Sequence, residues 1–157
     1  VAIRKFELYH GAVLVKIVRR SQSLTLFERG GDTAWAAYLV NDKACLYVKS
    51  SDQRGVSNGD ARFSYTFQPQ ETKFLCDQLA LRGESGVFLA LVCEDQEVAL
   101  LDSAQARCCI DLESSKAQNL TVLIPAGKSL RVYGPLNGRS AMLTIARNRI
   151  DTQDFPS

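Results

Sequence analysis

Residues 34–49 decide the fold, and they run Ala34-Trp-Ala-Ala-Tyr-Leu-Val40, then Asn41-Asp-Lys43, then Ala44-Cys-Leu-Tyr-Val-Lys49. The two outer runs are apolar and rich in residues that favour β-strands, and the connection between them is short and polar. Because so short a connection joins antiparallel neighbours, the sequence predicts a β-hairpin over these residues.

The segment before the hairpin predicts one helix and one strand. In residues 4–20, apolar side chains recur at spacings of three and four, which is typical of an amphipathic helix. Residues 23–28 alternate in polarity and predict a short strand, which ends at the turn residues Gly30 and Gly31.

After the hairpin, the sequence predicts a β-rich arrangement with one further helix. The expected elements are a polar, flexible loop over 50–60, a strand over 61–67, a helix over 70–81, a strand over 87–93 that is buried on both faces, a returning strand over 98–102, and a strand pair over 120–124 and 129–133. The fold class that follows is α/β (α+β), with a mixed central β-sheet, one helix before the first strands, one after the hairpin, and a β-rich C-terminal half.

The length of 157 residues is typical of one domain. We expect a single globular domain over residues 1–150 and a polar tail over 151–157. The sequence contains no apolar stretch of the roughly 20 residues that a membrane-spanning helix needs, so no membrane is expected as a partner. Five cysteines without a CxxC pair, and the lack of a signal-like segment, favour reduced thiols and a cytoplasmic location.

The net charge of +2 is too small to indicate nucleic-acid binding by itself, because phosphate affinity depends on clustered positive charge. Basic residues do cluster in two places. One cluster lies near the C-terminus and comprises Arg131, Arg139, Arg147 and Arg149. The other lies on the first helix and is the candidate binding surface, formed by Arg4, Lys5, Lys16, Arg19 and Arg20; an ordinary solvated face remains the alternative.

The order of the elements suggests a family. A helix carrying Glu7 is followed by a strand, a hairpin ending in Tyr47-Val-Lys49, a strand, a helix and an apolar strand. Over residues 4–102 this order resembles the core of the PD-(D/E)XK restriction-endonuclease-like superfamily. In that family a helix carboxylate precedes a hairpin that bears Asp and then Glu-x-Lys or Gln-x-Lys.

The resemblance implies a site in which acidic groups hold Mg²⁺ and a lysine activates water and stabilises charge on phosphate. Glu7 would be the helix carboxylate and Lys49 the lysine, with Asp42 as the second acidic group. The implied catalytic residues are therefore Lys49, Glu7 and Asp42, and the implied metal ligands are Glu7 and Asp42.

The chain departs from the family pattern at two positions. The hairpin offers Asn41, with Asp42 beside it, where the first acidic residue belongs, and Tyr47 where Glu or Gln belongs. Because fewer carboxylates lower the affinity for Mg²⁺, we expect a noncatalytic nuclease-like module without a cofactor, which binds nucleic acid or a protein partner.

Two alternatives remain open at the level of sequence. The first is an active metal-dependent nuclease with Mg²⁺ as cofactor. The second is a β-rich assembly domain of a homo-oligomer, because Phe63, Tyr65 and Phe67 alternate along one strand and would share one face. An aromatic face of this kind could pack against another subunit.

Overall fold

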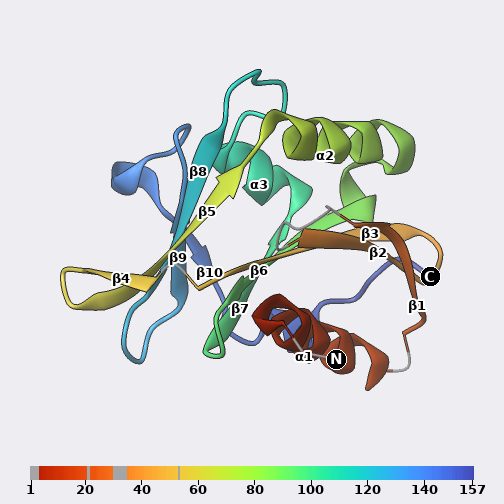
Figure 1. Cartoon of the computed structure of the whole chain (residues 1–157), viewed down its shortest axis with the longest axis horizontal. Coiled ribbons are helices and arrows are strands. Elements are labelled where there is room, and N and C mark those ends of the chain that lie inside the picture. The colour runs from red at the N-terminus through yellow and green to blue at the C-terminus, as the bar shows by residue number, and fades with distance from the viewer. Residues whose placement is uncertain (1–3, 21, 30–34, 53) are drawn as a thin grey trace.

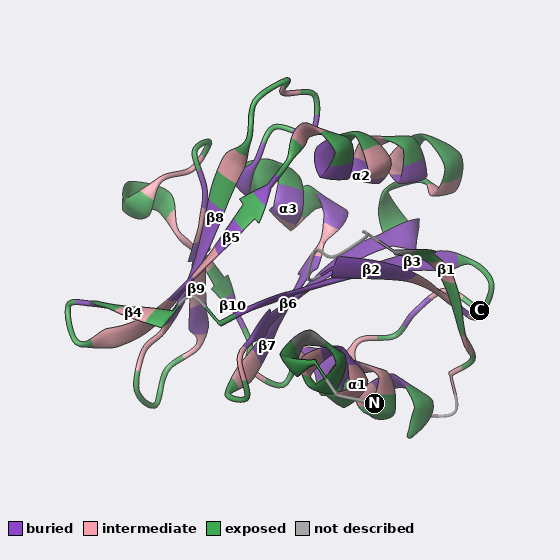
Figure 2. Ribbon diagram, viewed as in Figure 1, coloured by how far each residue is buried: buried purple, intermediate pink, exposed green. Residues whose placement is uncertain are grey.

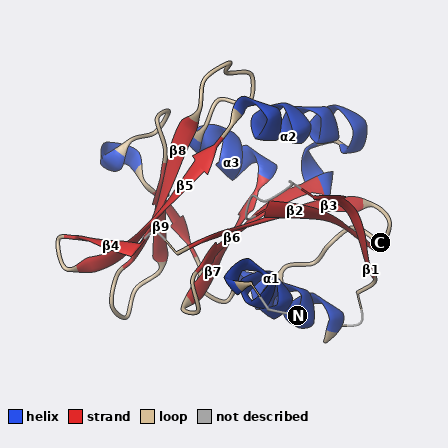
Figure 3. Ribbon diagram, viewed as in Figure 1, coloured by secondary structure: helices blue, strands red, loops and turns tan. Residues whose placement is uncertain are grey.

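A computed structural model describes residues 4–20, 22–29, 35–52 and 54–157. Its helices are α1 (Lys5–Val18), α2 (Pro69–Arg82), α3 (Ser103–Cys109) and α4 (Arg149–Thr152), with short 3-10 helices η1 (Glu84–Gly86) and η2 (Arg139–Ala141). Its strands are β1 (Leu24–Arg29), β2 (Trp35–Val40), β3 (Ala44–Ser51), β4 (Arg54–Ser57), β5 (Asp60–Phe67), β6 (Val87–Cys93), β7 (Glu97–Asp102), β8 (Gln118–Ile124), β9 (Leu130–Tyr133) and β10 (Leu143–Ile145). Figure 3 shows their distribution.

The strands form two five-stranded sheets. Sheet A has the order β1-β2-β3-β6-β7, and sheet B has the order β10-β9-β8-β5-β4. Strands β3 and β6 are parallel, and the chain between them passes through the β4–β5 hairpin of sheet B and through α2. The other neighbouring strands are antiparallel, so the predicted fold class, an α+β domain with a mixed central sheet, is confirmed.

Sheet A separates two hydrophobic cores. Helices α1 and α4 lie on one face, and α2, α3 and sheet B lie on the other (Figure 1). Strand β3 supplies both cores because its side chains alternate: Leu46 and Val48 pack against α1, whereas Cys45 and Tyr47 pack towards α2. Figure 2 shows this central sheet as the most buried part of the chain. The expected central position of residues 87–93 is confirmed, since β6 is buried along its whole length.

The aromatic residues of β5 face the interior. Phe63, Tyr65 and Phe67 are at most 1% exposed and belong to the core between the two sheets. Their alternation was predicted correctly. They are not available to another subunit, however, because the chain's own sheet A and α2 already cover them.

The predicted flexible loop over 50–60 is wrong. Strand β3 extends to Ser51, and Arg54–Ser57 form β4, which pairs antiparallel with β5. Asn58 and Gly59 make the turn with φ values of 50° and 86°. These positive φ values are those of the tight two-residue hairpin turn that an Asn-Gly pair favours, so the Asn58-Gly59 pair is the sequence signal for this hairpin.

The C-terminal residues, expected as a polar tail, pack onto the domain. The ring of Phe155 lies edge-on to Phe88 of β6, with the ring centroids 4.9 Å apart. The backbone carbonyl of Pro156 accepts a hydrogen bond from Asn41 Nδ2 at 3.2 Å, and that of Ser157 accepts one from Lys43 Nζ at 2.6 Å. The last residues therefore contact both β6 and the turn of the β2–β3 hairpin.

Across the part of the chain that the structure describes, we find no helix with both the length and the apolar character needed to cross a bilayer.

Candidate functional site

Lys49 belongs to a buried polar cluster between β3 and α2. Its Nζ donates a hydrogen bond to Oε1 of Glu71 at 2.5 Å, and the two side chains are only 10% and 2% exposed. Tyr47 lies two residues before Lys49, so it faces the same side of the sheet, and its hydroxyl donates to the same oxygen at 2.5 Å. The remaining Glu71 oxygen, Oε2, accepts the backbone N–H of Gln68 at 2.8 Å.

Glu71 is placed by the start of α2. Pro69 opens the helix, and Glu71 is the third helical residue, from which a carboxylate reaches back to the residue that caps the helix. One carboxylate thus caps α2 and binds two side chains of β3. The cluster holds the helix onto the sheet.

Aromatic rings enclose this cluster. Trp35 stacks on Tyr47 with ring centroids 4.8 Å apart, and Lys49 Nζ lies 5.0 Å from the centroid of Phe67. Burial, with the adjacent Glu71 carboxylate as a second cause, raises the pKa of Tyr47 far above its ordinary value. Tyr47 therefore stays protonated and acts as a donor, and Lys49 is directed at a carboxylate rather than at solvent.

Glu7 lies on the other side of sheet A. It is the third residue of α1, is exposed, and its Oε2 accepts the backbone N–H of Arg4 at 3.3 Å. Helix α1 packs on the face of the sheet opposite to Lys49. Glu7 therefore caps its own helix, as Glu71 does in α2, and does not meet Lys49.

Asp42 is distant from both of these residues. It occupies the β2–β3 turn, whereas Lys49 pairs with Trp35 at the other end of the hairpin. At about 3.3 Å per strand residue, this separation is roughly 20 Å. Asn41, next to Asp42, bonds to Gln22 beyond the C-terminal end of α1, a helix length away from Glu7.

The structure therefore does not bring Glu7, Asp42 and Lys49 together. Within the described ranges, no group of three or more His, Cys, Asp or Glu side chains is arranged to hold a metal ion.

Two of the five basic residues predicted as a binding surface are engaged by the C-terminal segment. Lys16 pairs with Asp151 at 2.9 Å, and Arg20 lies 3.5 Å from Asp154 while donating to the carbonyl of Gln153 at 2.6 Å. Arg4, Lys5 and Arg19 remain exposed on α1 or at its ends. This surface is consequently less positive than the sequence suggests.

A second basic surface lies on sheet B, on the face turned away from the core. Arg62 of β5 and Arg131 of β9 flank Leu123 of β8 in one row of paired residues, so both side chains leave the same face. Gly55 of β4 stands opposite Arg62, and a Cβ placed there would lie 2.6 Å from the Arg62 guanidinium. The glycine lets this guanidinium lie across the edge strand.

Arg139 of η2 adds a third guanidinium. Its Nη2 donates to Ser57 Oγ at 2.6 Å, and its Cζ lies 5.8 Å from the ring centroid of Tyr133. Tyr133 is paired with Thr121 on the outward-facing side of β9, two residues after Arg131. We call Arg62, Arg131, Arg139 and Tyr133 the sheet B basic face.

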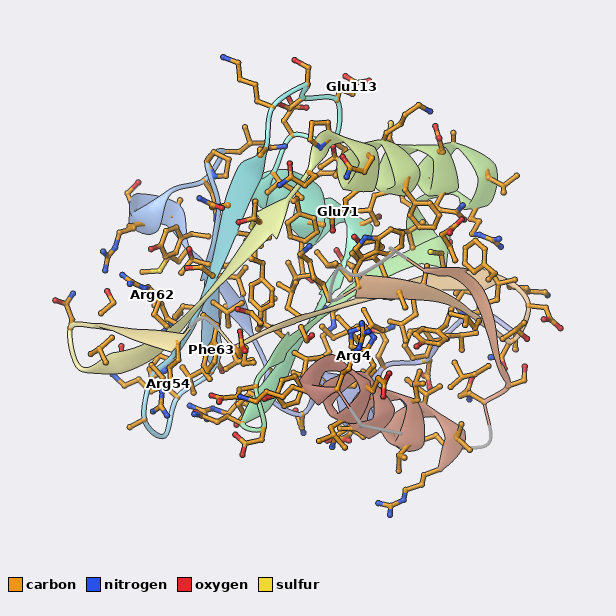
Figure 4. All side chains as sticks on the ribbon, in the orientation of Figure 1. Arg4, Arg54, Arg62, Phe63, Glu71 and Glu113 are labelled. Atoms are coloured by element: carbon orange, nitrogen blue, oxygen red, sulfur yellow. The ribbon has the colours of Figure 1, made fainter. Side chains whose placement is uncertain are left out.

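The charge of this region is strongly asymmetric. The strands of sheet B together with η2 contain four arginines (Arg54, Arg62, Arg131 and Arg139) and one acidic residue, Asp60, a formal charge of +3. The whole chain carries only +2. Among the described residues, none of the three arginines of the basic face forms an ion pair with a carboxylate. Figure 4 labels Arg54 and Arg62 near the β4–β5 hairpin, well away from Glu71 under α2.

The sequence signal for this face was partial. Arg131 and Arg139 belonged to the C-terminal basic cluster, but the structure removes the other two members from it: Arg147 pairs with Glu97 at 2.9 Å and Arg149 with Asp102 at 3.2 Å. Arg62 lay on a correctly predicted strand. Its position beside Arg131 depends on pairing of β5 with β8, which no local pattern reveals.

Comparisons of the chain with protein-family models, with curated proteins and with solved structures found no match.

Proposed function

We propose that this chain is a noncatalytic, nuclease-like module that binds nucleic acid through the sheet B basic face. The observation that carries the proposal is the clustering of charge: three arginines (Arg62, Arg131 and Arg139) and one acidic residue, Asp60, share the outward side of sheet B with η2, in a chain whose total formal charge is +2. Clustered positive charge on one face is the electrostatic signature of phosphate binding.

The chemistry of the face suits a phosphodiester backbone. A guanidinium can donate two parallel hydrogen bonds to one phosphate, which a point charge cannot do. Exposed Thr144, paired with Arg131, adds a hydroxyl on the same side of the sheet. Tyr133 offers a ring on which an unpaired base can stack.

Two features support a nuclease-like fold that lacks catalysis. The order α1, β1, the β2–β3 hairpin, β5, α2 and β6 agrees with the order on which the family resemblance rests. Lys49, the residue matched to the family's lysine, is bound to Glu71 and shielded from solvent. Cleavage of nucleic acid in Mg²⁺ or Mn²⁺ that disappears in Lys49→Ala would contradict this part of the proposal.

The test is salt-dependent binding measured by fluorescence anisotropy, with labelled single-stranded RNA, single-stranded DNA and duplex DNA as probes. If three phosphates are contacted, the slope of log K against log salt for single strands is about −2, so affinity falls about 20-fold between roughly 50 and 200 mM salt. No binding at low salt overturns the proposal.

Substitutions locate the surface. Arg62→Ala and Arg131→Ala should each weaken binding and reduce the magnitude of the salt slope by about 0.7 for single strands. Arg19→Ala, which removes an exposed arginine next to α1, is the matched control and should change neither. If Arg19→Ala weakens binding as much as the sheet B variants, the surface predicted from the sequence is the correct one and the sheet B basic face is not.

A further inference from the structure

Helix α1 has two apolar sides, and the domain uses only one of them. Val13 and Ile17 are fully buried against sheet A. On the outer side, Leu8, Ala12 and Val15 follow one another at spacings of four and three, and Leu8 and Val15 are 58% and 47% exposed. We call these three residues the α1 outer stripe. A helix that is apolar on both sides is expected to be covered on both.

A cavity of about 540 Å³ opens beside this stripe. Leu8, Tyr9 and Ala12 of α1 form one wall, and Val98 and Ile150 contribute apolar surface from β7 and α4. A volume of this size lies within the range of about 300–1,000 Å³ typical of ligand pockets. The cavity is therefore large enough for one or two apolar side chains from another molecule.

The acidic side chains that line the cavity are not all neutralised. Glu97 is paired with Arg147, and Asp151 is paired with Lys16, each at 2.9 Å. Glu94 and Asp95, on the turn between β6 and β7, line the same cavity. Neither side chain has an ion pair or hydrogen bond within the described ranges. Among the residues that the structure describes, the only carboxylates of the cavity without an ion pair are therefore Glu94 and Asp95 on the β6–β7 turn. Lys5 lies on the opposite wall, which α1 forms.

We propose that the α1 outer stripe and its cavity form a docking site for an amphipathic helix of a protein partner. The partner's apolar side chains cover Leu8 and Val15 and enter the cavity, while a flanking Lys or Arg pairs with Glu94 or Asp95. Gly11 and Ala12 in the middle of α1 favour a helical occupant. A Cβ at Gly11 would meet nothing within 4 Å, and such open, small positions let two helix axes approach to about 8 Å.

This site is separate from the sheet B basic face, so a loss of nucleic-acid binding and a loss of helix docking are independent results. The probe is a synthetic peptide of about 15 residues, long enough to be helical, with leucines at i, i+4 and i+7 and lysines on the flanks. A second peptide carries glutamates in place of the lysines. Both are titrated into the isotope-labelled full chain and followed by NMR.

The lysine peptide should shift the amides of α1 and of residues 94–98 and bind at least about tenfold more tightly than the glutamate peptide. The double variant Glu94→Lys/Asp95→Lys should reverse that preference. Retention of the original preference in this variant, or shifts confined to other surfaces, overturns the proposal.

Leu8→Ser should weaken binding of the lysine peptide about tenfold. The matched control is Leu136→Ser, because Leu136 is 57% exposed and Leu8 is 58% exposed, and it should leave the affinity unchanged. Thermal unfolding of both variants checks that each is folded. Sedimentation of the chain alone tests whether a second copy occupies the site. Self-association that Leu8→Ser abolishes would identify that second copy as the occupant and overturn the assignment to a partner helix.

Discussion

The ammonium of Lys49 on β3 lies 2.5 Å from Oε1 of Glu71 on α2, and both side chains are almost completely buried. Glu71 also caps α2 and accepts the hydroxyl of Tyr47. Lys49, the residue matched to the nuclease lysine by the family resemblance alone, therefore connects α2 to sheet A.

Removing one partner of this pair should strongly destabilise the fold. Lys49→Met leaves the Glu71 carboxylate buried without its counter-ion, and we expect a loss of about 3–5 kcal/mol in the free energy of unfolding. Urea unfolding measures it. The double variant Lys49→Met/Glu71→Gln should lose less than the sum of the single losses, since neither charge is then left alone; strictly additive losses would contradict a direct interaction.

Phe155 should contribute to stability although it lies only two residues before Ser157. Its ring packs on Phe88 and is 7% exposed, so Phe155→Ala should lower the free energy of unfolding by about 3 kcal/mol. Asp154→Ala is the neighbouring control, because the Asp154 side chain is fully exposed, and it should change stability by no more than about 0.5 kcal/mol. Equal effects of the two substitutions would show that the C-terminal residues do not pack as described.

Substitution by alanine should lower the stability at one glycine, Gly59, and raise it at another, Gly11. Gly59 has a φ of +86°, which an L side chain rarely adopts, so Gly59→Ala should destabilise the β4–β5 hairpin by about 1 kcal/mol. Gly11 is inside α1 with open space around it, so Gly11→Ala should stabilise by about 0.5–1 kcal/mol. Thermal unfolding compares both variants with the parent, and a stabilising Gly59→Ala would rule out the turn conformation.

The cysteines should differ sharply in reactivity. Burial raises the pKa of Cys45 and Cys93 to about 12, whereas Cys108 is exposed. A thiol reagent at about pH 8 should therefore modify Cys108 rapidly and the two buried thiols only as fast as the protein unfolds. Cys108→Ser should remove the rapid phase; a rapid phase that persists with the same amplitude would contradict the described burial.

The same shifts predict an alkaline limit to stability. The folded-state pKa of Cys45 and Cys93 lies above the ordinary value of 9.0, so the folded state retains protons that the unfolded state has lost. Their contribution to stability is complete below pH 9 and is lost as the pH rises towards 12, by up to about 1.4 kcal/mol per pH unit and per thiol. Urea unfolding at a series of pH values should show a shallower decline in Cys45→Ala than in the parent.

Local patterns in the sequence were sufficient for most of the secondary structure. The spacing of Val13 and Ile17 predicted α1, the alternation of Phe63, Tyr65 and Phe67 predicted β5, and the apolar run from Val87 to Cys93 predicted a buried strand. The β4–β5 hairpin was missed although Asn58-Gly59 marks it, because the surrounding serines and glycines suggested an irregular loop.

The candidate site was less accessible from the sequence than the fold. Glu7, Asp42 and Lys49 were assigned to one hypothetical site because the order of the elements along the chain resembles that of the nuclease family. No geometric observation linked the three residues. In the structure Glu7 and Lys49 are on opposite faces of sheet A, and Asp42 is at the far end of the hairpin.

The sequence by itself determined α1 and α2, most of the strands and the α+β class, since these depend on the periodicity of apolar residues a few positions apart; the short helices α3 and α4 were not predicted. The tertiary structure decided which charged side chains form ion pairs and which lie together on one surface. Lys49 pairs with Glu71, which is 22 residues away in the sequence, and Lys16 pairs with Asp151, which is 135 residues away. Arg62 lies near Arg131 because β5 pairs with β8 and β8 pairs with β9. The physical reason is that the effect of a charge depends on its distance in space and on its burial, and neither is encoded in the local spacing of residues.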